Sequence, residues 1–508
     1  MRVTDESSST AAENPYDVVI VGMGPVGAAL ANLLAIRHVR VLVLEREADS
    51  YALPRAVQFD GECMRVFQTI GIAAELLPDL LVVPGMRFVD AAGRLLIDWT
   101  RPTTLGPQGW HASYRFHQPN LERTLRERLQ SRAEVDIRCL HEVCTLEPRD
   151  EYVDVGVKDH ATGRLRGVRA RFVVGCDGAR STVRRFMGTE LDDLKSHQRW
   201  LVVDVVLKHE RPDLGDHAVQ YCDPARPTTY IRGIGMRRRW ELMLRPDEDA
   251  ATMTRPDRIW PLLERWLTPD EAILERPAAY TFHSVVARGW RRGRLLIAGD
   301  AAHQTPPFMG QGMCAGIRDA SNLAWKLAGV LNGSAAETLL DTYESERSPH
   351  VREFIETALR LGAVIHATGN DAAATSVEPQ QFATPEPRLG PGAHDGSSSA
   401  GRIAPQPAVG GTPLDDLVGY RDVLVATPEF ATQAQSLAKD LVVVAAKEEA
   451  MAKWLHRMGA QAALIRPDRY LAGIADDERS LVKLLSTYAA RCGRVGLAGA
   501  QARVAACE

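Results

Sequence analysis

Hydrophobic positions near the start of the folded region come in continuous runs. Residues 16–22 read YDVVIVG and residues 39–45 read VRVLVLE, with the segment PVGAALANLLAIR at 25–37 between them. A short apolar run is typical of a strand that is covered on both faces, and the small and apolar residues of 25–37 favour a helix. The three segments together predict a βαβ unit with parallel strands.

Two later apolar runs, ARFVVGCD at 170–177 and GRLLIAGD at 293–300, each end in an aspartate that a helical segment follows. We expect both runs to join the first sheet. Between residues 190 and 290 the pattern changes to alternation, as in RWELMLRPD at 239–247. Alternation is typical of antiparallel, half-exposed strands, so this region is predicted to be an inserted substrate domain.

The remaining regions differ in composition. Residues 1–15 lack periodicity and are predicted to be a disordered tail, and a long helical region ends near residue 365. Residues 366–412 are rich in Gly, Pro, Ser and Ala, which is typical of a linker. Strand and helix signals then alternate over residues 413–508, which predicts a third, α/β domain.

Composition narrows the range of partners and compartments. The net charge is −4, the isoelectric point is near 6.4 and 25% of residues are charged, so no strong field favours nucleic acid or an anionic membrane. The N-terminal residues lack a signal-peptide pattern, and no apolar run approaches the roughly 20 residues of a membrane span. The eight cysteines form no CxxC pair, so we expect a cytoplasmic protein with reduced thiols and no metal site.

The glycines of GMGPVG follow the first predicted strand. In a βαβ unit, Gly22 permits the tight turn, Gly24 lets a pyrophosphate approach the backbone, and Gly27 lets helix and strand pack closely. Glu45 stands 23 residues after Gly22, where a carboxylate can accept hydrogen bonds from ribose hydroxyls. This pattern favours FAD or NAD over a plain turn, and its acidic residue disfavours NADP.

A second candidate segment, GDAAHQTPPFMGQGM, begins at Gly299. Asp300 offers a carboxylate at a strand end, and prolines stiffen the loop that follows. Gly310 and Gly312 then open a helix whose N-terminus can face an anion, such as a reduced isoalloxazine ring. A helix cap and a simple connector are the alternative readings of these residues.

The sequence resembles the single-component flavoprotein aromatic hydroxylases of the para-hydroxybenzoate and phenol hydroxylase type. Three motifs carry the resemblance over residues 16 to about 365: GMGPVG with Glu45, CDGARSTVR, and GDAAHQTPPFMGQGM. The segments LPRAVQFDGECMRVFQTIGI, FHQPNLERTLRERL, RIAPQP and LIRPDRYLAGIA are most similar to the 3-(3-hydroxyphenyl)propionate hydroxylase branch. Met309 departs from the family, which more often has glycine there.

The resemblance implies an α/β fold with a discontinuous FAD-binding, Rossmann-like domain of the GR2 type at residues 16–190 and 285–365. A mixed-sheet substrate domain at 190–285 and a C-terminal thioredoxin-like domain complete this expected fold. Without CxxC, the last domain is expected to be redox-inert and to have a structural role, such as stabilising a homodimer.

The resemblance also implies tight, non-covalent FAD and a transient NAD(P)H co-substrate. His303, in the third motif, is expected to be a buried structural histidine. Arg46 and Gln118 also have purely structural interpretations: Arg46 as a solvated surface charge and Gln118 as a helix-capping residue. The implied FAD-binding residues are Gly22, Gly24, Gly27, Glu45, Arg46, Arg55, Gln118, Asp177, Asp300, Pro307, Gly310, Gly312 and Met313.

By resemblance, FAD is reduced by NAD(P)H and adds O₂ to form a C4a-hydroperoxide that hydroxylates a phenolic ring. A base that removes the phenol proton makes the ring more nucleophilic. Asp60 in FDGECMR is the predicted base, and the alternative is that it caps the helix that follows. Arg232 and Arg245 are candidates for binding a substrate carboxylate. Two other functions stay open at this point: a flavoprotein epoxidase or polyketide-tailoring oxygenase, and a flavin-binding redox sensor.

Overall fold

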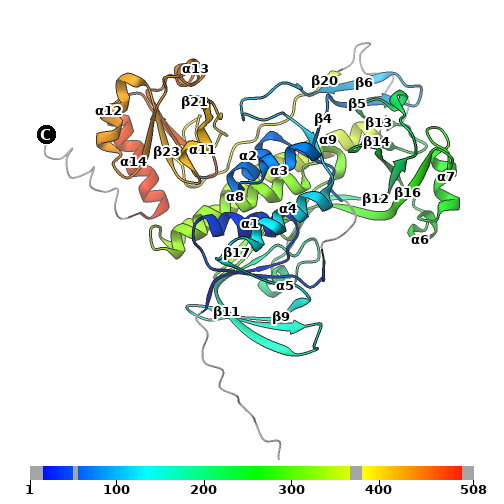
Figure 1. The fold of residues 1–508 in the computed structure, drawn as a ribbon, viewed down its shortest axis with the longest axis horizontal. Coiled ribbons are helices and arrows are strands. Elements are labelled where there is room, and N and C mark those ends of the chain that lie inside the picture. Colours follow the sequence, from blue (N-terminus) through cyan, green and yellow to red (C-terminus); the bar gives the residue numbers. More distant parts are fainter. Residues whose placement is uncertain (1–14, 50–54, 367–379, 495–508) are drawn as a thin grey trace, which may run out of the picture.

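The computed structural model describes residues 15–49, 55–366 and 380–494. The chain forms two large sheets, a central group of helices and a C-terminal α/β domain (Figure 1). The tail predicted at 1–15 lies almost entirely outside the described residues. No helix in the described ranges is long and apolar enough to cross a membrane.

The first sheet confirms the predicted βαβ unit. β1 (Tyr16–Val21) pairs in parallel with β2 (Val41–Leu44), and α1 (Pro25–Ile36) connects them. The two later apolar runs become β11 (Leu165–Gly175) and β18 (Leu295–Ile297), which extend the same sheet in parallel. All residues of β2 and β18 are buried, which explains their continuous hydrophobic sequences. β8 (Val135–Arg138), β9 (His141–Pro148), β10 (Val153–Asp159) and β17 (Arg291–Arg292) complete it.

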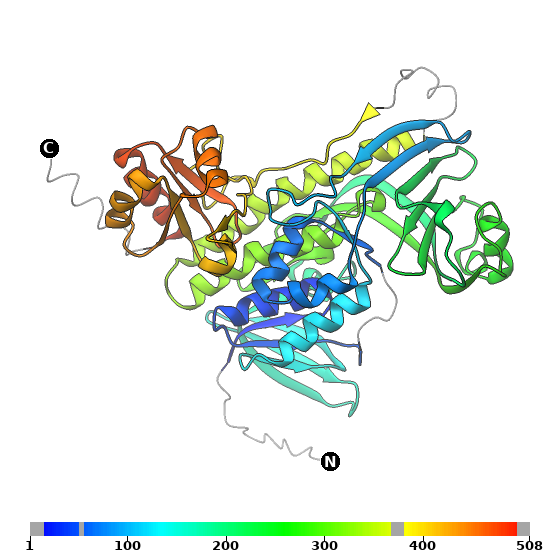
Figure 2. The ribbon, with the colours of Figure 1, turned by 45° about the horizontal axis from the view of Figure 1, so that its top comes forward.

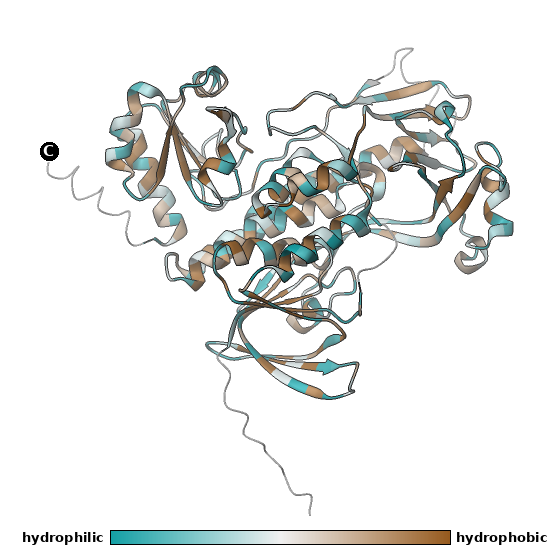
Figure 3. Cartoon of the chain, in the orientation of Figure 1, coloured by the Kyte–Doolittle hydropathy of each residue, from teal (hydrophilic) through white to brown (hydrophobic). Residues whose placement is uncertain are grey.

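A layer of helices covers this sheet and separates it from the second sheet (Figures 1 and 2). The longest are α8 (Gly312–Leu331) and α9 (Thr342–His366), and α8 packs along α1. Hydrophobic residues line the strands and the facing sides of these helices, as the brown ribbon in Figure 3 shows. Two shorter helices belong to this layer: α2 (Gly61–Ile70) and α4 (Gln118–Gln130).

The second sheet has nine strands and is mainly antiparallel, as the alternating pattern predicted. Its two longest strands, β12 (Leu191–Leu207) and β16 (Ala272–Ala287), pair with each other next to the short edge strand β19. β15 (Arg237–Met243) pairs with the other edge of β12. The remaining strands from within the predicted substrate domain are β13 (Ala218–Cys222) and β14 (Thr228–Arg232), and β19 (His303–Gln304) closes one edge.

Besides β19, two strands of the second sheet come from residues that were assigned to the FAD-binding domain. β5 (Gly85–Asp90) pairs with β13, and β6 (Leu95–Thr100) pairs with β5. The assignment of every residue before 190 to the first domain is therefore wrong for these strands. β5 and β6 form a hairpin, and pairing with the distant strand β13 places it in the second sheet.

The described part of the predicted linker packs against the rest of the chain at several positions. Leu389, Ala393, Ala400 and Ala404 are buried, and β20 (Gln380–Gln381) pairs with β6. Residues 367–379 lie outside the described residues. Gly and Pro permit the extended path of residues 380–412, while backbone hydrogen bonds to neighbouring elements fix it.

The C-terminal domain contains a mixed four-stranded sheet in the order β24–β23–β25–β26. β23 and β24 are parallel, and the other two pairings are antiparallel. This βαβ unit followed by a ββα unit agrees with the predicted thioredoxin-like domain. Its elements are β23 (Val423–Ala426), α12 (Pro428–Leu437), β24 (Val442–Ala445), α13 (Glu449–Arg457), β25 (Ala462–Ile465), β26 (Leu471–Ala475) and α14 (Glu478–Cys492).

A buried ionic cluster joins this domain to α8 and α9. The Glu346 carboxylate accepts hydrogen bonds from Lys326 of α8 at 2.8 Å and from Arg466, which follows β25, at 2.8 and 2.9 Å. Asp468 also binds Arg466, at 2.6 Å. These four side chains are at most 1% exposed, so loss of one charge leaves an unbalanced charge that water does not reach.

We predict that Glu346→Gln lowers the free energy of unfolding by about 3–5 kcal/mol, because it leaves Lys326 and Arg466 with one carboxylate. Denaturant unfolding at pH 7 measures the loss. Arg466 and Lys326 outweigh the effect of burial and hold the pKa of Glu346 far below its ordinary value. The stabilisation is therefore present above the unfolded pKa of about 4.3 and is lost as the pH falls, so the deficit of the variant shrinks in acid.

Glu356→Gln is the matched control, because Glu356 lies on the same helix and is exposed. We expect this control to unfold within about 0.5 kcal/mol of the unsubstituted protein. Equal stability of the two variants at pH 7 contradicts a stabilising role for the cluster.

Candidate functional site

The glycine turn has the geometry that the sequence predicted. Gly22 has φ = +98°, and a Cβ there would lie 2.6 Å from the carbonyl oxygen of Cys176. A Cβ on Gly27 would collide with the carbonyl oxygen of Gly22. Gly24 differs, since a Cβ there would meet no atom within 4 Å. The first and third glycines therefore allow close packing, and Gly24 faces open space that a ligand can occupy.

Glu45 fixes this turn. Its carboxylate accepts hydrogen bonds from the backbone N–H of Met23 at 2.8 Å and of Glu47 at 3.0 Å. A carboxylate has further lone pairs, so the predicted contact with a ribose stays a prediction. The neighbouring Arg46 is 68% exposed and pairs with Glu47 at the rim of the cavity described next.

A cavity of about 1110 Å³ lies between the first sheet, the start of α8 and the second sheet. It brings together most of the predicted FAD-binding residues. Gly22, Gly27 and Glu45 are outside its lining and support the turn from behind. The predicted residues that line it are Gly24, Arg46, Arg55, Gln118, Asp177, Asp300, Pro307, Gly310, Gly312 and Met313.

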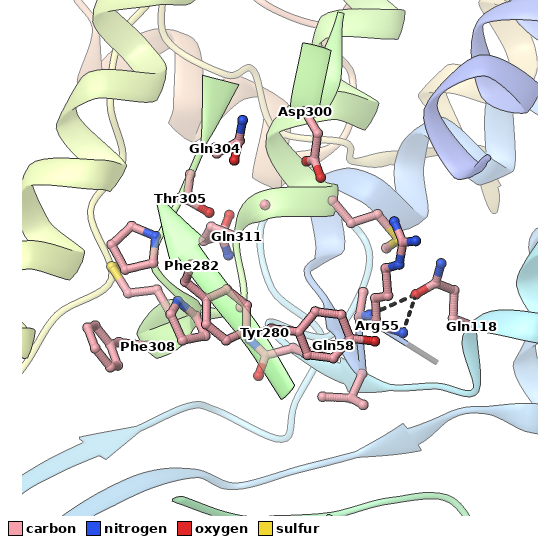
Figure 4. Close-up of a pocket in the computed structure, with 18 of the residues that line it drawn as sticks. Arg55, Gln58, Gln118, Tyr280, Phe282, Asp300, Gln304, Thr305, Phe308 and Gln311 are labelled. Carbon is pink, nitrogen blue, oxygen red and sulfur yellow. Dashed lines mark hydrogen bonds between the residues drawn. The ribbon is translucent and has the colours of Figure 1, made fainter. Parts of the chain in front are cut away.

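Gln118 positions Arg55 in this cavity. Its side-chain oxygen accepts hydrogen bonds from the backbone N–H groups of Arg55 at 2.8 Å and Ala56 at 2.7 Å (Figure 4). Gln118 is the first residue of α4, yet its amide nitrogen binds Glu122. It therefore holds the loop at residues 55–56, and the alternative reading of Gln118 as a helix cap is not what the structure shows.

Asp300 is an unpaired acceptor that faces the cavity (Figure 4). Among the described residues, no group donates a hydrogen bond to its carboxylate. Burial raises the pKa of Asp300, while His303 and Arg55 oppose that shift. A carboxylate in this setting is well suited to accept hydrogen bonds from sugar-alcohol hydroxyls, such as those of a ribityl chain.

The N-terminus of α8 also points into the cavity. Pro306 and a short 3₁₀ turn precede Gly310, which has φ = +63°. The N-cap residue Gln311 forms no side-chain cap, so the N–H groups of Gly312 and Met313 remain available to a ligand. Met309 is buried in this turn and its φ is not positive. The backbone there therefore does not require the glycine that the family more often has.

Asp177 and His303 have supporting roles. Asp177 accepts hydrogen bonds from the N–H groups of Thr182 and Val183 through one oxygen, and its other oxygen is buried without a partner in the described part of the chain. His303 is 1% exposed and binds Asp319 at 2.6 Å. The expectation that His303 is a buried structural histidine is confirmed.

Asp60 caps α2, as the alternative interpretation expected. Its Oδ1 accepts from the N–H of Cys63 at 3.1 Å, and its Oδ2 accepts from Arg318 at 2.6 Å and Gln311 at 3.3 Å. Although burial alone raises it, the pKa of Asp60 is lowered by Arg318. Asp60 does not line the cavity, whereas Gln311 does. The base role assigned to Asp60 stays a prediction.

Asp60, Cys63 and Cys314 bring their potential ligand atoms within 4.8 Å of one another. Burial raises the pKa of the Cys63 thiol well above its ordinary value, and metal ions bind thiolates. Arg318 already neutralises Asp60. This chemistry does not suit a cation.

Side chains from the second sheet, from residues near its strands and from Phe308 in the 3₁₀ turn at Pro307–Met309 form the rest of the wall, and none of them was among the predicted site residues. Tyr280 has a buried hydroxyl without a partner among the described residues. Neither Arg232 nor Arg245 lines the cavity, because Arg232 pairs with Asp216 and Arg245 is exposed. The wall residues missed from the sequence are Met86, Trp99, Arg101, Ser113, Arg115, Arg239, Glu241, Tyr280, Phe282 and Phe308.

The residues present fit FAD. The open face of Gly24 and the unpaired Asp300 carboxylate match the pyrophosphate and ribityl parts of the cofactor. The uncapped N-terminus of α8 suits the pyrimidine edge of the ring.

Comparison with known families gives two matches. The family described as FAD binding domain matches residues 15–358, and the HcaD C-terminal domain matches residues 421–490. The second match covers the domain that was predicted to be thioredoxin-like.

Two relatives illustrate the similarity. The "Probable NADH-specific resorcinol 4-hydroxylase" of Rhodococcus jostii (strain RHA1) is 45% identical over 360 residues, which cover 70% of this chain and 66% of that protein. The chain thus aligns with just under two thirds of that relative. The 3-(3-hydroxy-phenyl)propionate/3-hydroxycinnamic acid hydroxylase of Burkholderia cenocepacia (strain HI2424) is 35% identical over 521 residues, covering 91% of this chain and 94% of that protein.

Solved structures share the fold at lower identity. The flavin-dependent monooxygenase PieE, in complex with FAD and substrate, superposes with a TM-score of 0.81 at 22% identity. That match covers 95% of this chain and 100% of PieE. Aklavinone-11 hydroxylase, with FAD and aklavinone, gives a TM-score of 0.77 at 23% identity, covering 95% and 100% of the chains.

We predict that Gly24→Ala weakens FAD binding without unfolding the protein. The φ of Gly24 is −70°, and the added Cβ meets no protein atom but enters the space next to a bound pyrophosphate. If the added methyl group costs about 1–3 kcal/mol in the complex, the Kd for FAD rises about 5- to 150-fold. Fluorescence titration of the FAD-free protein with FAD measures it.

Gly167→Ala is the matched control, because that Cβ also meets no atom and Gly167 lies outside the cavity lining. Equal FAD affinities for the two alanine variants overturn the assignment of Gly24 to the pyrophosphate.

Proposed function

Because the chain belongs to the FAD-binding-domain family of flavoprotein aromatic hydroxylases, we propose that it hydroxylates a phenolic ring, with NADH as reductant and O₂ as oxidant. The observation that carries this proposal is a single cavity that joins the FAD cradle to an aromatic wall. The names of the two relatives suggest resorcinol and 3-(3-hydroxyphenyl)propionate as substrates to test, and one of them suggests NADH.

Bound FAD supplies the activation of O₂, and the chain supplies position, exclusion of water and proton handling. Phe282 and Phe308 make the wall apolar, as expected for a site that excludes water (Figure 4). The Tyr280 hydroxyl is buried and free to bond the phenolic oxygen of a substrate. These three residues fit a flat aromatic ring that carries one polar group.

Two carboxyl groups can accept the phenolic proton. Asp60 is ionised at neutral pH because Arg318 lowers its pKa, and it contacts the cavity-lining Gln311. Glu241 lines the cavity itself, and burial raises its pKa. A higher pKa makes a stronger base toward a phenol, whose own pKa is about 10. The two residues are therefore tested side by side.

The function is tested with purified protein, NADH, O₂ and a panel of phenols. We expect NADH oxidation to rise when resorcinol or 3-(3-hydroxyphenyl)propionate is added, and a product with one new ring hydroxyl to form. Oxygen uptake and chromatography of the product measure this, with phenol-free reactions as controls. If no member of the panel stimulates NADH oxidation or gains a hydroxyl, ring hydroxylation of such phenols is excluded.

If Asp60 is the base, Asp60→Asn keeps FAD and the fold, because asparagine also caps helices. We predict that hydroxylation falls by about 10²- to 10⁴-fold while NADH oxidation continues, so hydrogen peroxide replaces product. Product and peroxide per NADH measure this coupling. Full coupling in Asp60→Asn together with uncoupling in Glu241→Gln transfers the base role to Glu241.

A further inference from the structure

Four arginines are buried at or beside the cavity wall, and two carboxylates oppose them. Arg101, Arg115 and Arg239 line the cavity and are at most 7% exposed. Arg276, 2% exposed, lies behind Arg239 and approaches Asp204 at 3.9 Å. The opposing acids are Asp204 and Glu241.

Both acids are committed to Arg239. Asp204 binds its guanidinium through two hydrogen bonds of 2.6 and 2.9 Å, and Glu241 lies 3.7 Å from it. Arg239 also donates to the carbonyl oxygen of Arg55 at 2.8 Å, which ties the second sheet to the FAD-binding loop. The charge of Arg239 is therefore neutralised within the protein.

Arg101 and Arg115 have no such partner. Among the described residues, no carboxylate lies within ion-pair distance of either guanidinium. Arg101 stacks on Trp99, with 4.5 Å between the guanidinium carbon and the ring centroid. Arg115 donates one hydrogen bond to Gln58, and its Nε is buried without a partner. The nearby hydroxyl of Ser113 is also buried and unpartnered.

Arg101, Ser113 and Arg115 thus all line the cavity near the end of β6 and the strand β7 (Tyr114–Arg115), and the Arg115 Nε and the Ser113 hydroxyl have no partner among the described residues. Burial of an unpaired cation is costly, and this cost lowers the pKa of Arg101 to about 10. Burial and the positive charge of Arg101 lower the pKa of Arg115 to about 9. An anion at this position relieves both costs.

We propose that Arg101, Ser113 and Arg115 form a subsite for the carboxylate of an aromatic acid substrate. Planar guanidinium groups match the geometry of a carboxylate, and a serine hydroxyl adds a third donor. The inference rests on the proposed function and narrows it to phenols that carry an acidic side chain. Tyr280 remains the partner for the phenolic end of the same molecule.

The test compares 3-(3-hydroxyphenyl)propionate with its carboxamide, which has nearly the same shape and no charge. Binding is measured at pH 7 as the change in the visible spectrum of FAD bound to the full-length protein, without turnover. We expect the acid to bind about 10- to 100-fold more tightly than the amide, as charge-assisted hydrogen bonds predict. Equal Kd values, or tighter binding of the amide, overturn the proposal.

Arg101→Gln is the main variant, because its guanidinium forms no ion pair whose loss could unfold the protein. We expect its Kd for the acid to rise about 10- to 100-fold and its Kd for the amide to change less than about threefold. Arg101→Lys keeps the charge and should recover part of the affinity. Arg245→Gln is the control, since Arg245 is exposed and outside the cavity lining, and it should bind as the unsubstituted protein does.

FAD affinity of Arg101→Gln is measured in parallel, because a reduced flavin is another anion near the cavity. A loss of FAD affinity without a change in the acid-to-amide ratio assigns Arg101 to the flavin and overturns the subsite. Hydroxylation of resorcinol tests the proposed function separately, since this neutral phenol does not need the subsite. Activity on resorcinol with no preference for the acid disproves only the further inference.

Discussion

Buried charge pairs along α8 set the positions of the parts around it. From its first turn onward, this helix lines the cavity, pairs with α2, and then joins α9 and the C-terminal domain. Arg318 binds Asp60 and Glu62 at 2.6 Å each, Asp319 binds His303 and Arg347, and Lys326 binds Glu346. Such pairs are costly to break once buried, so together they fix the register of α8 against the start of α2, against β19 and against α9. The N–H groups that face the predicted flavin site are held in place by contacts further along the same helix.

The C-terminal domain therefore influences the site although it supplies none of the cavity lining. Tyr470 of this domain donates to Glu62 at 2.6 Å, and Glu62 pairs with Arg318, which in turn pairs with Asp60. Asp415 forms a second buried contact, with Arg65 of α2 at 2.6 Å. This domain has no CxxC pair, and the prediction that it is redox-inert leaves a structural role as the expected one. These hydrogen bonds supply a structural one, because they hold α2 and α8 beside the cavity.

The parts of the site that bind the cofactor could be predicted from sequence because local backbone geometry makes them. A tight turn at Gly22, a strand-end carboxylate at Asp300 and a helix start at Gly312 each need a particular residue within a few positions. Such requirements leave short motifs. The placement of β5 and β6 in the second sheet and the packing of residues 380–412 escaped prediction because pairing between distant strands and loops decides them. Composition alone cannot report those contacts.

The substrate wall has no motif for the same reason. Arg101 follows β6, Arg115 belongs to the two-residue strand β7 and Arg239 to β15, and none of the three lies in a recognisable sequence motif. The three arginines differ in the acids beside them. Arg239 has Asp204 and Glu241, whereas Arg101 and Arg115 have no carboxylate within ion-pair distance among the described residues. That imbalance exists only after the second sheet has formed with β5 and β6 in it. The part of the cavity assigned to FAD is formed by backbone geometry at particular residues. The opposite wall is formed by side chains, which a substitution can change without altering the backbone. On the proposal above, the charge of Arg101 makes this cavity favour an acidic over a neutral phenol, and this preference is set independently of the residues assigned to FAD.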